Sequence, residues 1–396
     1  MKLKKIFFLL KNLKKIKFKL NKENIIIYDG TSLRHLHYTL KDLKYFVLED
    51  RLERINIIYF TPSVLFYILN YFNLFFRGYS LKLIYTISLI RTIDPKVVLT
   101  SIDNSINFFL ISKILKNKFF LLAIQNTNRF VGTEKFQHHL DEGKIFPKNY
   151  RDLFYIPNYI CFGEHVKKNL TKNKLKVDKF FTFGSLQVGN FLHHVRENNI
   201  KLDKKLFDIC FISEPALSNE LSNFKELIIK LLKYSIKISI LNNLKFIFVN
   251  KYFENTEESK EEINFYKTNL DAEEFSFLIN NKNIKQNIYS SYLGLFQSTM
   301  AIGCQSTMLL QKISCKEKIL SCNMSNDKIF DFEIKGICSI FNPSYDDFQS
   351  RVKMILSINN GEYLKKLDYD PNYYLNFDEN ENIIDKTRGL INKNLN

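Results

Sequence analysis

Residues 303 to 307 (GCQST) have the types and spacing that could bind a phosphate group. An apolar stretch, Thr299 to Ile302, leads into this glycine turn, and an apolar helical pattern begins at Met308. A strand, a glycine turn and a helix in this order direct backbone N–H groups and two hydroxyls toward an anion above the helix N-terminus. Ser306 and Thr307 could equally be ordinary helix caps. The spacing alone leaves both interpretations open.

Polar residues also follow other predicted strands, in both halves of the chain. Ligands of open parallel sheets bind beyond the carboxyl ends of the strands. In the first half the polar residues at such ends are Asp29, Gly30, Thr31, Asp103, Asn104, Gln125 and Asn126, and in the second half they are Ser213, Glu214, Lys251, Gln305, Ser306 and Thr307. Each one alone could be a loop residue, but their recurrence in both halves predicts a ligand site between two domains.

Other residue types that carry out catalysis give weaker signals. His35 and His37 follow the first strand and could act as a base, or they could be surface residues of a helix. The sequence contains no HExxH, GxSxG or Walker-type motif, and no GxGxxG follows the first strand. The six cysteines show no CxxC pair and no Cys/His ligand spacing, so we expect reduced cysteines and no metal site.

The composition indicates a soluble globular protein with two domains. The chain has 396 residues, of which 45% are hydrophobic and 25% are charged. A formal net charge of +17 favours anionic partners such as phosphorylated donors or anionic lipid. Because the basic residues are spread widely rather than gathered with aromatic residues along one groove, we expect no nucleic-acid partner.

Residues 1–23 form a basic segment with a short apolar run. The run, Ile6 to Leu10, is too short for a signal peptide or a membrane span. Lysines interleave with Ile, Leu and Phe, which predicts an amphipathic helix on an anionic membrane surface. A solvated helix or basic tail is the alternative interpretation. We therefore expect a cytoplasmic protein, or one that is peripheral at the inner face of the membrane.

Short strands alternate with helices throughout, which predicts an α/β fold with two Rossmann-like domains that face a cleft. The first domain spans residues 24–190, with predicted strands at 24–28, 55–60, 96–101, 119–124, 159–162 and 180–183. The second spans residues 205–360, with predicted strands at 207–212, 244–250, 275–280, 299–302, 318–321 and 336–340. Residues 361–396 are predicted to form a polar C-terminal tail.

Several of these segments resemble motifs of a known enzyme group. Residues 301–320, AIGCQSTMLLQKISCKEKIL, resemble the "IGxxSTxxxEaxxxgKkvL" signature of GT-B glycosyltransferases that build bacterial surface polysaccharides. Residues 123–129, AIQNTNR, resemble the "iQnGxR" turn of the same group. Related enzymes include the Kdo and sialic acid transferases and the CDP-glycerol glycerophosphotransferases. Over residues 24–360 the chain is most similar to the surface carbohydrate biosynthesis proteins.

The resemblance implies a nucleotide-sugar donor in the second domain and a saccharide or lipid-linked saccharide acceptor on the side of the first. The matching positions imply that the donor is bound by Gly303, Gln305, Ser306, Thr307, Gln311, Lys251 and Glu214, and that the acceptor side is lined by Gly30, Thr31, Asn104, Gln125, Asn126 and Arg129. Asp29 or Asp103 would deprotonate the acceptor hydroxyl. The nucleotide sugar is a substrate, so no cofactor is implied, and cationic side chains would stabilise the leaving group without a metal.

The chain departs from the family pattern at two positions. Gln311 replaces the glutamate that tends to hold the donor ribose, and Thr127 replaces the glycine of the "QnG" turn. The expected function is metal-independent glycosyl transfer. A CDP-glycerol-type phosphotransferase or a sugar-nucleotide epimerase on the same fold is the alternative within the enzyme class, and a non-catalytic saccharide-binding or scaffold protein is the alternative outside it.

Overall fold

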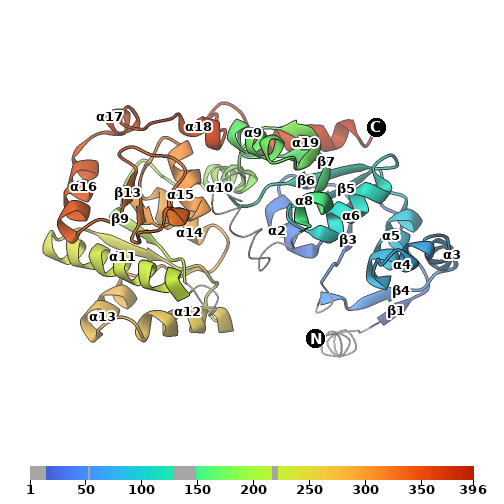
Figure 1. Cartoon of the computed structure of the whole chain (residues 1–396), viewed down its shortest axis with the longest axis horizontal. Coiled ribbons are helices and arrows are strands. Elements are labelled where there is room, and N and C mark those ends of the chain that lie inside the picture. The colour runs from blue at the N-terminus through green and yellow to red at the C-terminus, as the bar shows by residue number, and fades with distance from the viewer. Residues whose placement is uncertain (1–14, 52–53, 129–148, 216–221) are drawn as a thin grey trace.

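A computed structural model describes residues 15–51, 54–128, 149–215 and 222–396 of the chain. Its helices and strands form two lobes that lie side by side, each built on a parallel sheet (Figure 1). The first sheet draws its strands from residues 25–181 and the second from residues 207–341. The predicted fold class, an α/β protein with two Rossmann-like domains, is confirmed.

The first sheet contains six parallel strands in the order β3-β2-β5-β6-β7-β8. Its strands are β2 (Ile25–Tyr28), β3 (Phe46–Leu48), β5 (Val97–Thr100), β6 (Phe120–Ile124), β7 (Tyr155–Ile160) and β8 (Lys176–Phe181). The central strands are nearly continuous apolar runs, because such sheets are covered on both faces. Ile26 pairs with Val98, and Val98 pairs with Leu121, so the carboxyl ends of these strands meet at one edge.

Two predictions for the first lobe are wrong. A strand is present at the predicted 55–60 as β4 (Ile57–Tyr59), but its expected place in the first sheet is wrong, because it pairs with β1 (Lys15–Lys17) in a separate two-stranded sheet. β3, which the sequence analysis missed, lies beside β2 instead and buries Leu48. The predicted basic helix does not include Lys15–Lys17, because lysine alternates with apolar residues there at the two-residue period of a strand. The remainder of that prediction, residues 1–14, lies outside the described residues.

The second sheet contains five parallel strands in the order β10-β9-β11-β12-β13. They are β9 (Phe207–Ile212), β10 (Phe246–Val249), β11 (Ser298–Gly303), β12 (Lys318–Asn323) and β13 (Ser339–Phe341). The predicted strand at 275–280 is wrong, because these residues belong to helix α13 (Ala272–Asn280). A capping box between Asp271 and Glu274 starts this helix and satisfies its first backbone donors.

Helices connect the strands of both sheets. In the first lobe they are η1 (Gly30–Ser32), α2 (Leu33–Leu36), α3 (Pro62–Asn70), α4 (Asn73–Phe76), α5 (Leu81–Ile93), α6 (Ile106–Leu115), α8 (Tyr150–Leu153), α9 (Glu164–Lys172) and α10 (Leu186–Glu197). Those that follow are α11 (Ser222–Leu241), α12 (Glu257–Lys267), α13, α14 (Ser290–Phe296), α15 (Thr307–Ser314), η4 (Lys328–Phe330), α16 (Tyr345–Ser357), α17 (Asn360–Leu364), α18 (Pro371–Tyr374) and α19 (Ile383–Lys393). None of the helices within the described ranges has both the length and the apolar character needed to cross a bilayer.

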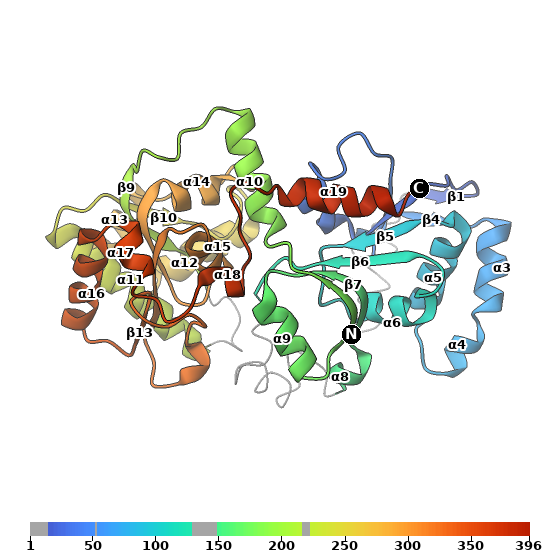
Figure 2. The same ribbon diagram turned by 90° about the horizontal axis from the view of Figure 1, so that it is seen from above.

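Two segments pass between the lobes. α10 follows the last strand of the first sheet and leads toward β9, and the chain returns to the first lobe through α18 and α19 (Figures 1 and 2). The prediction of a polar tail over 361–396 is therefore wrong. α19 buries Ile383, Ile384 and Ile391 in the core of the first lobe. Because these residues occupy one face of a helix whose other face is polar, the segment has a polar composition overall.

Close backbone contacts fix the returning segment to the first lobe. Asn376 N donates to Phe162 O at 2.8 Å, and the Asn376 side-chain amide donates to Thr182 O at 2.9 Å. Gly184 has a φ of +98°, and a Cβ at this position would lie 2.1 Å from Asn376 O. Both the backbone angle and the lack of space therefore require glycine at this position.

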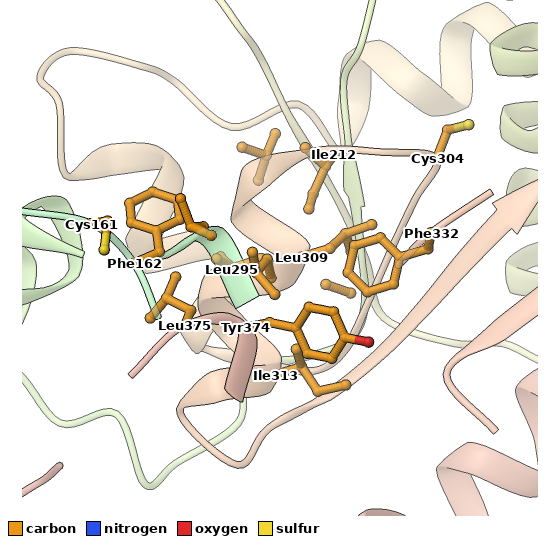
Figure 3. Packing of buried hydrophobic residues seen from close by; sticks show 14 of the residues in the cluster. Cys161, Phe162, Ile212, Leu295, Cys304, Leu309, Ile313, Phe332, Tyr374 and Leu375 are labelled. Atoms are coloured by element: carbon orange, nitrogen blue, oxygen red, sulfur yellow. The ribbon is translucent and has the colours of Figure 1, made fainter. Parts of the chain in front are cut away.

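Apolar side chains from both lobes pack together at this junction. Phe162 comes from the first lobe, Tyr374 and Leu375 from the returning segment, and Leu309 and Ile313 from α15 of the second lobe (Figure 3). All five side chains are buried. The lobes thus share one continuous core at the junction, which limits how freely they can separate.

We predict that Ile391→Ala lowers the free energy of unfolding by about 2–4 kcal/mol, because it removes a fully buried side chain that joins α19 to the first lobe. Ile284→Ala is the control, since Ile284 is 60% exposed. The free energy of unfolding of this variant should differ from that of the wild type by less than about 0.5 kcal/mol. Urea unfolding followed by circular dichroism measures both. Equal losses in the two variants would contradict the packing of α19.

Candidate functional site

The predicted glycine turn is present, but a carboxylate of the protein itself occupies it. β11 ends at Gly303 and α15 begins at Thr307. Glu214 Oε1 accepts a hydrogen bond from Cys304 N at 2.7 Å and from Gln305 N at 3.2 Å. A Cβ at position 303 would lie 3.1 Å from this carboxylate, so glycine permits the close approach. A phosphate at the turn would have to compete with Glu214 for the same two donors.

The two hydroxyls at the start of α15 are also engaged. Ser306 is the N-cap, and its Oγ accepts from Met308 N. Thr307 Oγ1 accepts from Asn128 N of the first lobe at 3.0 Å. The capping interpretation therefore holds for Ser306, whereas Thr307 joins the loop after β11 to the loop after β6. The neighbouring Gln305 is nearly buried and donates to Ile329 O at 2.9 Å.

Gln311 lies in a buried polar network between the lobes. Its Nε2 donates to Ser185 Oγ at 2.8 Å and to Gln187 Oε1 at 2.9 Å, both at the start of α10. Its Oε1 accepts from the Tyr292 hydroxyl at 2.9 Å. A glutamate could not donate the first two bonds. Gln311 therefore has a role at the lobe junction that a glutamate could not fill.

Asp29 is held as an anion by its neighbours. Its backbone φ is +66°, and its carboxylate accepts from Thr31 N at 2.9 Å and from the Thr31 hydroxyl at 2.6 Å. Arg51 Nε pairs with the other oxygen at 3.1 Å. Burial raises the pKa of Asp29, but the Thr31 hydrogen bonds and the Arg51 charge outweigh burial and lower it. A carboxylate stabilised in this way is a weak proton acceptor.

The remaining first-lobe candidates differ in exposure. Asp103 is buried and accepts from the Tyr159 hydroxyl at 2.8 Å. Gln125 is also buried; it accepts from Phe162 N at 2.8 Å and donates to Thr127 O at 3.1 Å. Both therefore hold the edge of the sheet together. The candidates that are at least partly exposed are Gly30, Thr31, Asn104 and Asn126. Arg129 lies outside the described residues.

Cationic side chains gather on both lobes, and the sequence analysis named only one of them, Lys251. We call Arg34, Arg51, Arg54, Lys251 and Lys285 the interlobe cation cluster. Burial, followed by the charges of Arg54 and Arg51, lowers the pKa of Arg34. Burial also lowers the pKa of Lys285 to about 8. The charge of Glu262 opposes this shift, whereas the charges of Arg34 and Lys251 add to it. His37 and Tyr289, which join the two lobes at 2.8 Å, follow Arg34 and Lys285 by three and four residues in the sequence.

The carboxylates near the cation cluster already accept hydrogen bonds, and they neutralise only one of its members, Arg51. Asp29 pairs with Arg51, and Glu262 accepts from Lys251 N at 2.9 Å and from Tyr252 N at 3.1 Å. Within the described part of the chain, no carboxylate lies within salt-bridge distance of Arg34, Arg54, Lys251 or Lys285. An excess of positive charge between two lobes attracts an anion, and guanidinium groups suit phosphate in particular.

Glu49 is a candidate proton acceptor that the sequence analysis missed. It directly follows β3, and its Oε2 accepts from Gly30 N at 3.3 Å. Burial raises the pKa of Glu49 and the Asp29 charge adds to the rise, although the Gly30 bond and two arginines of the cluster oppose it. A carboxyl group with a raised pKa suits proton transfer near neutral pH. The available signal was the acidic pair Glu49-Asp50 after a short apolar run, Phe46–Leu48.

The two candidate histidines orient other groups. Burial, followed by the charges of Arg34 and His37, lowers the pKa of His35 to about 3, so the ring stays neutral at physiological pH. His35 Nε2 accepts from Arg34 Nε at 3.0 Å and so orients one member of the cation cluster. His37 Nε2 lies 2.8 Å from the hydroxyl of Tyr289 in the second lobe, and burial lowers its pKa. His37 therefore contributes to the contact between the lobes.

The cysteines are free thiols, as expected, and most of them are buried. Burial raises the pKa of Cys161 and of Cys210 to about 12, so both stay protonated at neutral pH. Cys304, in the glycine turn, is also buried. Among the residues that the structure describes, no group of three His, Cys, Asp or Glu side chains could hold a metal ion.

A cavity of about 400 Å³ lies beside the crossing segments rather than at the cation cluster. Its walls include Phe183, Leu192, Phe296 and Phe377, with Glu317 and Lys386 among the charged residues. No member of the cation cluster lines it. We assign this cavity to the junction of α10 with the returning segment and not to the candidate site.

Comparison with solved structures bears on the fold of the chain. The UDP co-structure of MnaA from S. aureus matches with a TM-score of 0.50, covering 94% of each chain at 9% sequence identity. The chain has the GT-B fold. A UDP-GlcNAc 2-epimerase from Neisseria meningitidis bound to UDP-GlcNAc matches at TM-score 0.46 and 12% identity, over 94% of this chain and 98% of the other. The wall teichoic acid polymerase TagF matches at TM-score 0.47 and 10% identity, over 99% and 92%. No protein-family model and no curated protein matches the sequence.

We predict that Glu214→Ala lowers the free energy of unfolding by about 1.5–3 kcal/mol, because it removes hydrogen bonds from two backbone amides to a charged group. Inorganic phosphate should recover part of this loss in the variant, since the vacated amides form an anion site. Urea unfolding with and without phosphate measures both effects. The exposed Glu226→Ala is the control. An identical phosphate response in wild type and Glu214→Ala would contradict the self-occupied turn.

Proposed function

We propose that this GT-B chain is a glycosyltransferase that moves a sugar from a nucleotide-sugar donor to a surface polysaccharide or lipid-linked saccharide acceptor, without a metal. The observation that supports the proposal is the contact between the lobes at His37 and Tyr289, 2.8 Å apart, because Arg34 and Lys285 lie three and four residues before them in the sequence. A nucleotide-sugar diphosphate has the charge to bind beside such cations. In this proposal the enzyme works on the cytoplasmic side of the membrane.

The cation cluster has the chemistry that departure of a nucleoside diphosphate requires. Negative charge grows on the phosphate oxygens as the glycosidic bond breaks, and fixed cations in a partly dry site lower the barrier to that step. Arg34 is held in place by His35, and Lys251 is fixed through its backbone N–H to Glu262. The cluster therefore meets the leaving group with side chains that need little rearrangement.

Glu49 is the residue that we propose as the proton acceptor for the acceptor hydroxyl. Asp29 and Asp103, the two candidates from the sequence, are each held by hydrogen bonds, and the pKa of Asp29 is lowered. The pKa of Glu49 is raised, and the residue is partly exposed next to Gly30 and Thr31. Asp29 then positions Thr31 and Arg51 around the reacting groups rather than receiving the proton.

We predict that a nucleotide raises the melting temperature of the protein and that Lys285→Met removes most of this rise. The test is a thermal-shift panel of CMP, CDP, UDP and GDP at millimolar concentration, where binding stabilises the fold by mass action. Lys260→Met is the control, because Lys260 is an exposed lysine paired with Glu257. A nucleotide response that is equal in both variants would contradict the placement of the phosphates. A response that also survives Ser306→Ala with Thr307→Ala would exclude the glycine turn as the phosphate site.

The affinity for the nucleotide should fall as the pH rises through about 8. Lys285 is a cation below its lowered pKa of about 8 and becomes neutral above it, so the attraction for phosphate is present at pH 7 and weakened at pH 9. Because the bound anion favours the charged form of Lys285, nucleotide binding between pH 7 and pH 9 is accompanied by uptake of a proton. Titration calorimetry at pH 7 and pH 9 measures the change. Lys285→Met should bind more weakly at pH 7 and lose this pH dependence.

We predict that Glu49→Gln lowers the rate of sugar transfer by about 10²–10⁴-fold while the thermal shift by nucleotide is retained. The reason is that glutamine keeps the shape of Glu49 and its bond from Gly30 but cannot accept a proton. Transfer from a radiolabelled nucleotide sugar to membrane extract measures the rate, and Glu226→Gln is the control. Epimerisation of the donor without any transfer would replace the glycosyltransferase proposal with an epimerase.

A further inference from the structure

Two short helices at the outer end of the first lobe expose large apolar side chains. α3 and α4 lie at the end of this lobe that points away from the second lobe (Figures 1 and 2). Phe76 is 79% exposed, Leu69 74% and Phe66 59%, and Phe72 and Phe75 are also exposed. We call these five residues the α3–α4 patch. Only Val64 of α3 and Leu74 of α4 are buried, so these helices place most of their apolar side chains outside the core.

The aromatic rings of the α3–α4 patch gather into one surface. The ring of Phe72 lies 5.7 Å from that of Phe75 and 5.6 Å from that of Phe76, and the rings of Phe75 and Phe76 are 6.0 Å apart. Single exposed apolar residues are common on proteins, but contiguous ones indicate an interaction surface. Three exposed phenylalanine rings in mutual contact therefore need a partner that removes them from water.

The chain segment that carries the patch has charged residues of one sign only. Residues 54–93, which include α3, α4 and α5, contain no aspartate or glutamate, and Arg77 directly after α4 is exposed. Strand β1 adds exposed lysines at 15 and 17, with Lys19 and Lys22 following it. This strand is joined to the start of α3, because Phe60 N donates to Lys17 O at 2.8 Å. Two further exposed side chains, Ile16 and Phe18, alternate with these lysines.

We propose that the α3–α4 patch and the β1 lysines form a docking surface for an anionic lipid bilayer. Phenylalanine and leucine side chains enter the boundary between headgroups and acyl chains, while lysine and arginine remain beside the lipid phosphates. The absence of carboxylates over residues 54–93 removes the repulsion that an anionic bilayer would otherwise meet. The surface differs from the expected N-terminal membrane helix, because its apolar side chains belong to α3 and α4 of the folded first lobe, and only its lysines come from the basic segment 1–23.

The docking surface is independent of the transferase activity, but it has a consequence for the proposed acceptor. It lies on the first lobe, which is the acceptor side in the proposed function. Docking through α3 and α4 would hold this lobe at the bilayer and leave the second lobe in the aqueous phase (Figure 1). A lipid-linked saccharide would then reach the lobe interface from the membrane surface.

Vesicle co-sedimentation of the full-length protein tests the proposal. The vesicles are phosphatidylcholine alone or phosphatidylcholine mixed with phosphatidylglycerol. The patch variant is Phe72→Ser, Phe75→Ser and Phe76→Ser combined, and the control variant is Leu206→Ser, Leu241→Ser and Tyr369→Ser, which removes exposed apolar side chains elsewhere. Because all six positions are exposed, we expect both variants to retain the wild-type circular dichroism spectrum.

The expected result is that wild type and control bind the mixed vesicles, and that the patch variant partitions at least tenfold less. Lys15→Gln, Lys17→Gln and Lys19→Gln combined should weaken binding to the mixed vesicles by about fivefold for each lysine near the surface, and added salt should have a similar effect. Wild-type partitioning of the patch variant would overturn the proposal. Equal binding of wild type to both vesicle types would overturn its anionic character. A patch variant that changes the oligomeric state on size exclusion without changing vesicle binding would assign the surface to a second copy of the chain instead.

Discussion

The docking of α15 on the first lobe is the contact on which the arrangement of the interlobe region depends. Thr307 accepts from Asn128 N at the start of this helix, and Gln311, one turn later, donates to Ser185 and Gln187 at the start of α10. Leu309 and Ile313 lie in the buried core that the two lobes share. Buried hydrogen bonds inside an apolar junction are costly to break without replacement, so they hold the two sheets at one separation. The opposition of Arg34 and Lys285 follows from that separation.

The glycine turn and the cation cluster could each bind an anion, but they differ in what neutralises them. At the glycine turn the protein supplies its own carboxylate, Glu214, to backbone amides that would otherwise bind phosphate. At the cation cluster Asp29 neutralises only Arg51, and burial together with neighbouring like charges lowers the pKa of Arg34 and of Lys285. A leaving diphosphate would relieve that crowding, which is why the proposed site is the cluster. The remote α3–α4 patch concerns the location of the enzyme rather than its chemistry.

Much of the fold could be predicted from the sequence, because local patterns dominate it. Buried runs such as Ile25–Tyr28 and Phe207–Ile212 are recognisable as strands of parallel sheets, and the glycine turn correctly separates β11 from α15. The errors have physical causes. α13 was predicted as a strand from its apolar residues although a capping box starts a helix at Asp271. The C-terminal segment was predicted as a tail because only one face of α19 is apolar, and a one-sided helix has a polar average composition.

The sequence by itself determined the class of the fold, the identity of the strands around the site and the resemblance of the turn to a phosphate-binding motif. Its strand-end rule also selected Glu214, which lies at the turn, together with Asp29 and Lys251. Only the tertiary structure decided that Glu214 fills the turn, that Gln311 joins the lobes, and that Arg34, Glu49 and Lys285 come near the same region. The reason is that strand periodicity and helix caps depend on neighbours along the chain. Contacts between residues as distant as 185 and 311 depend instead on how two separately folded sheets meet.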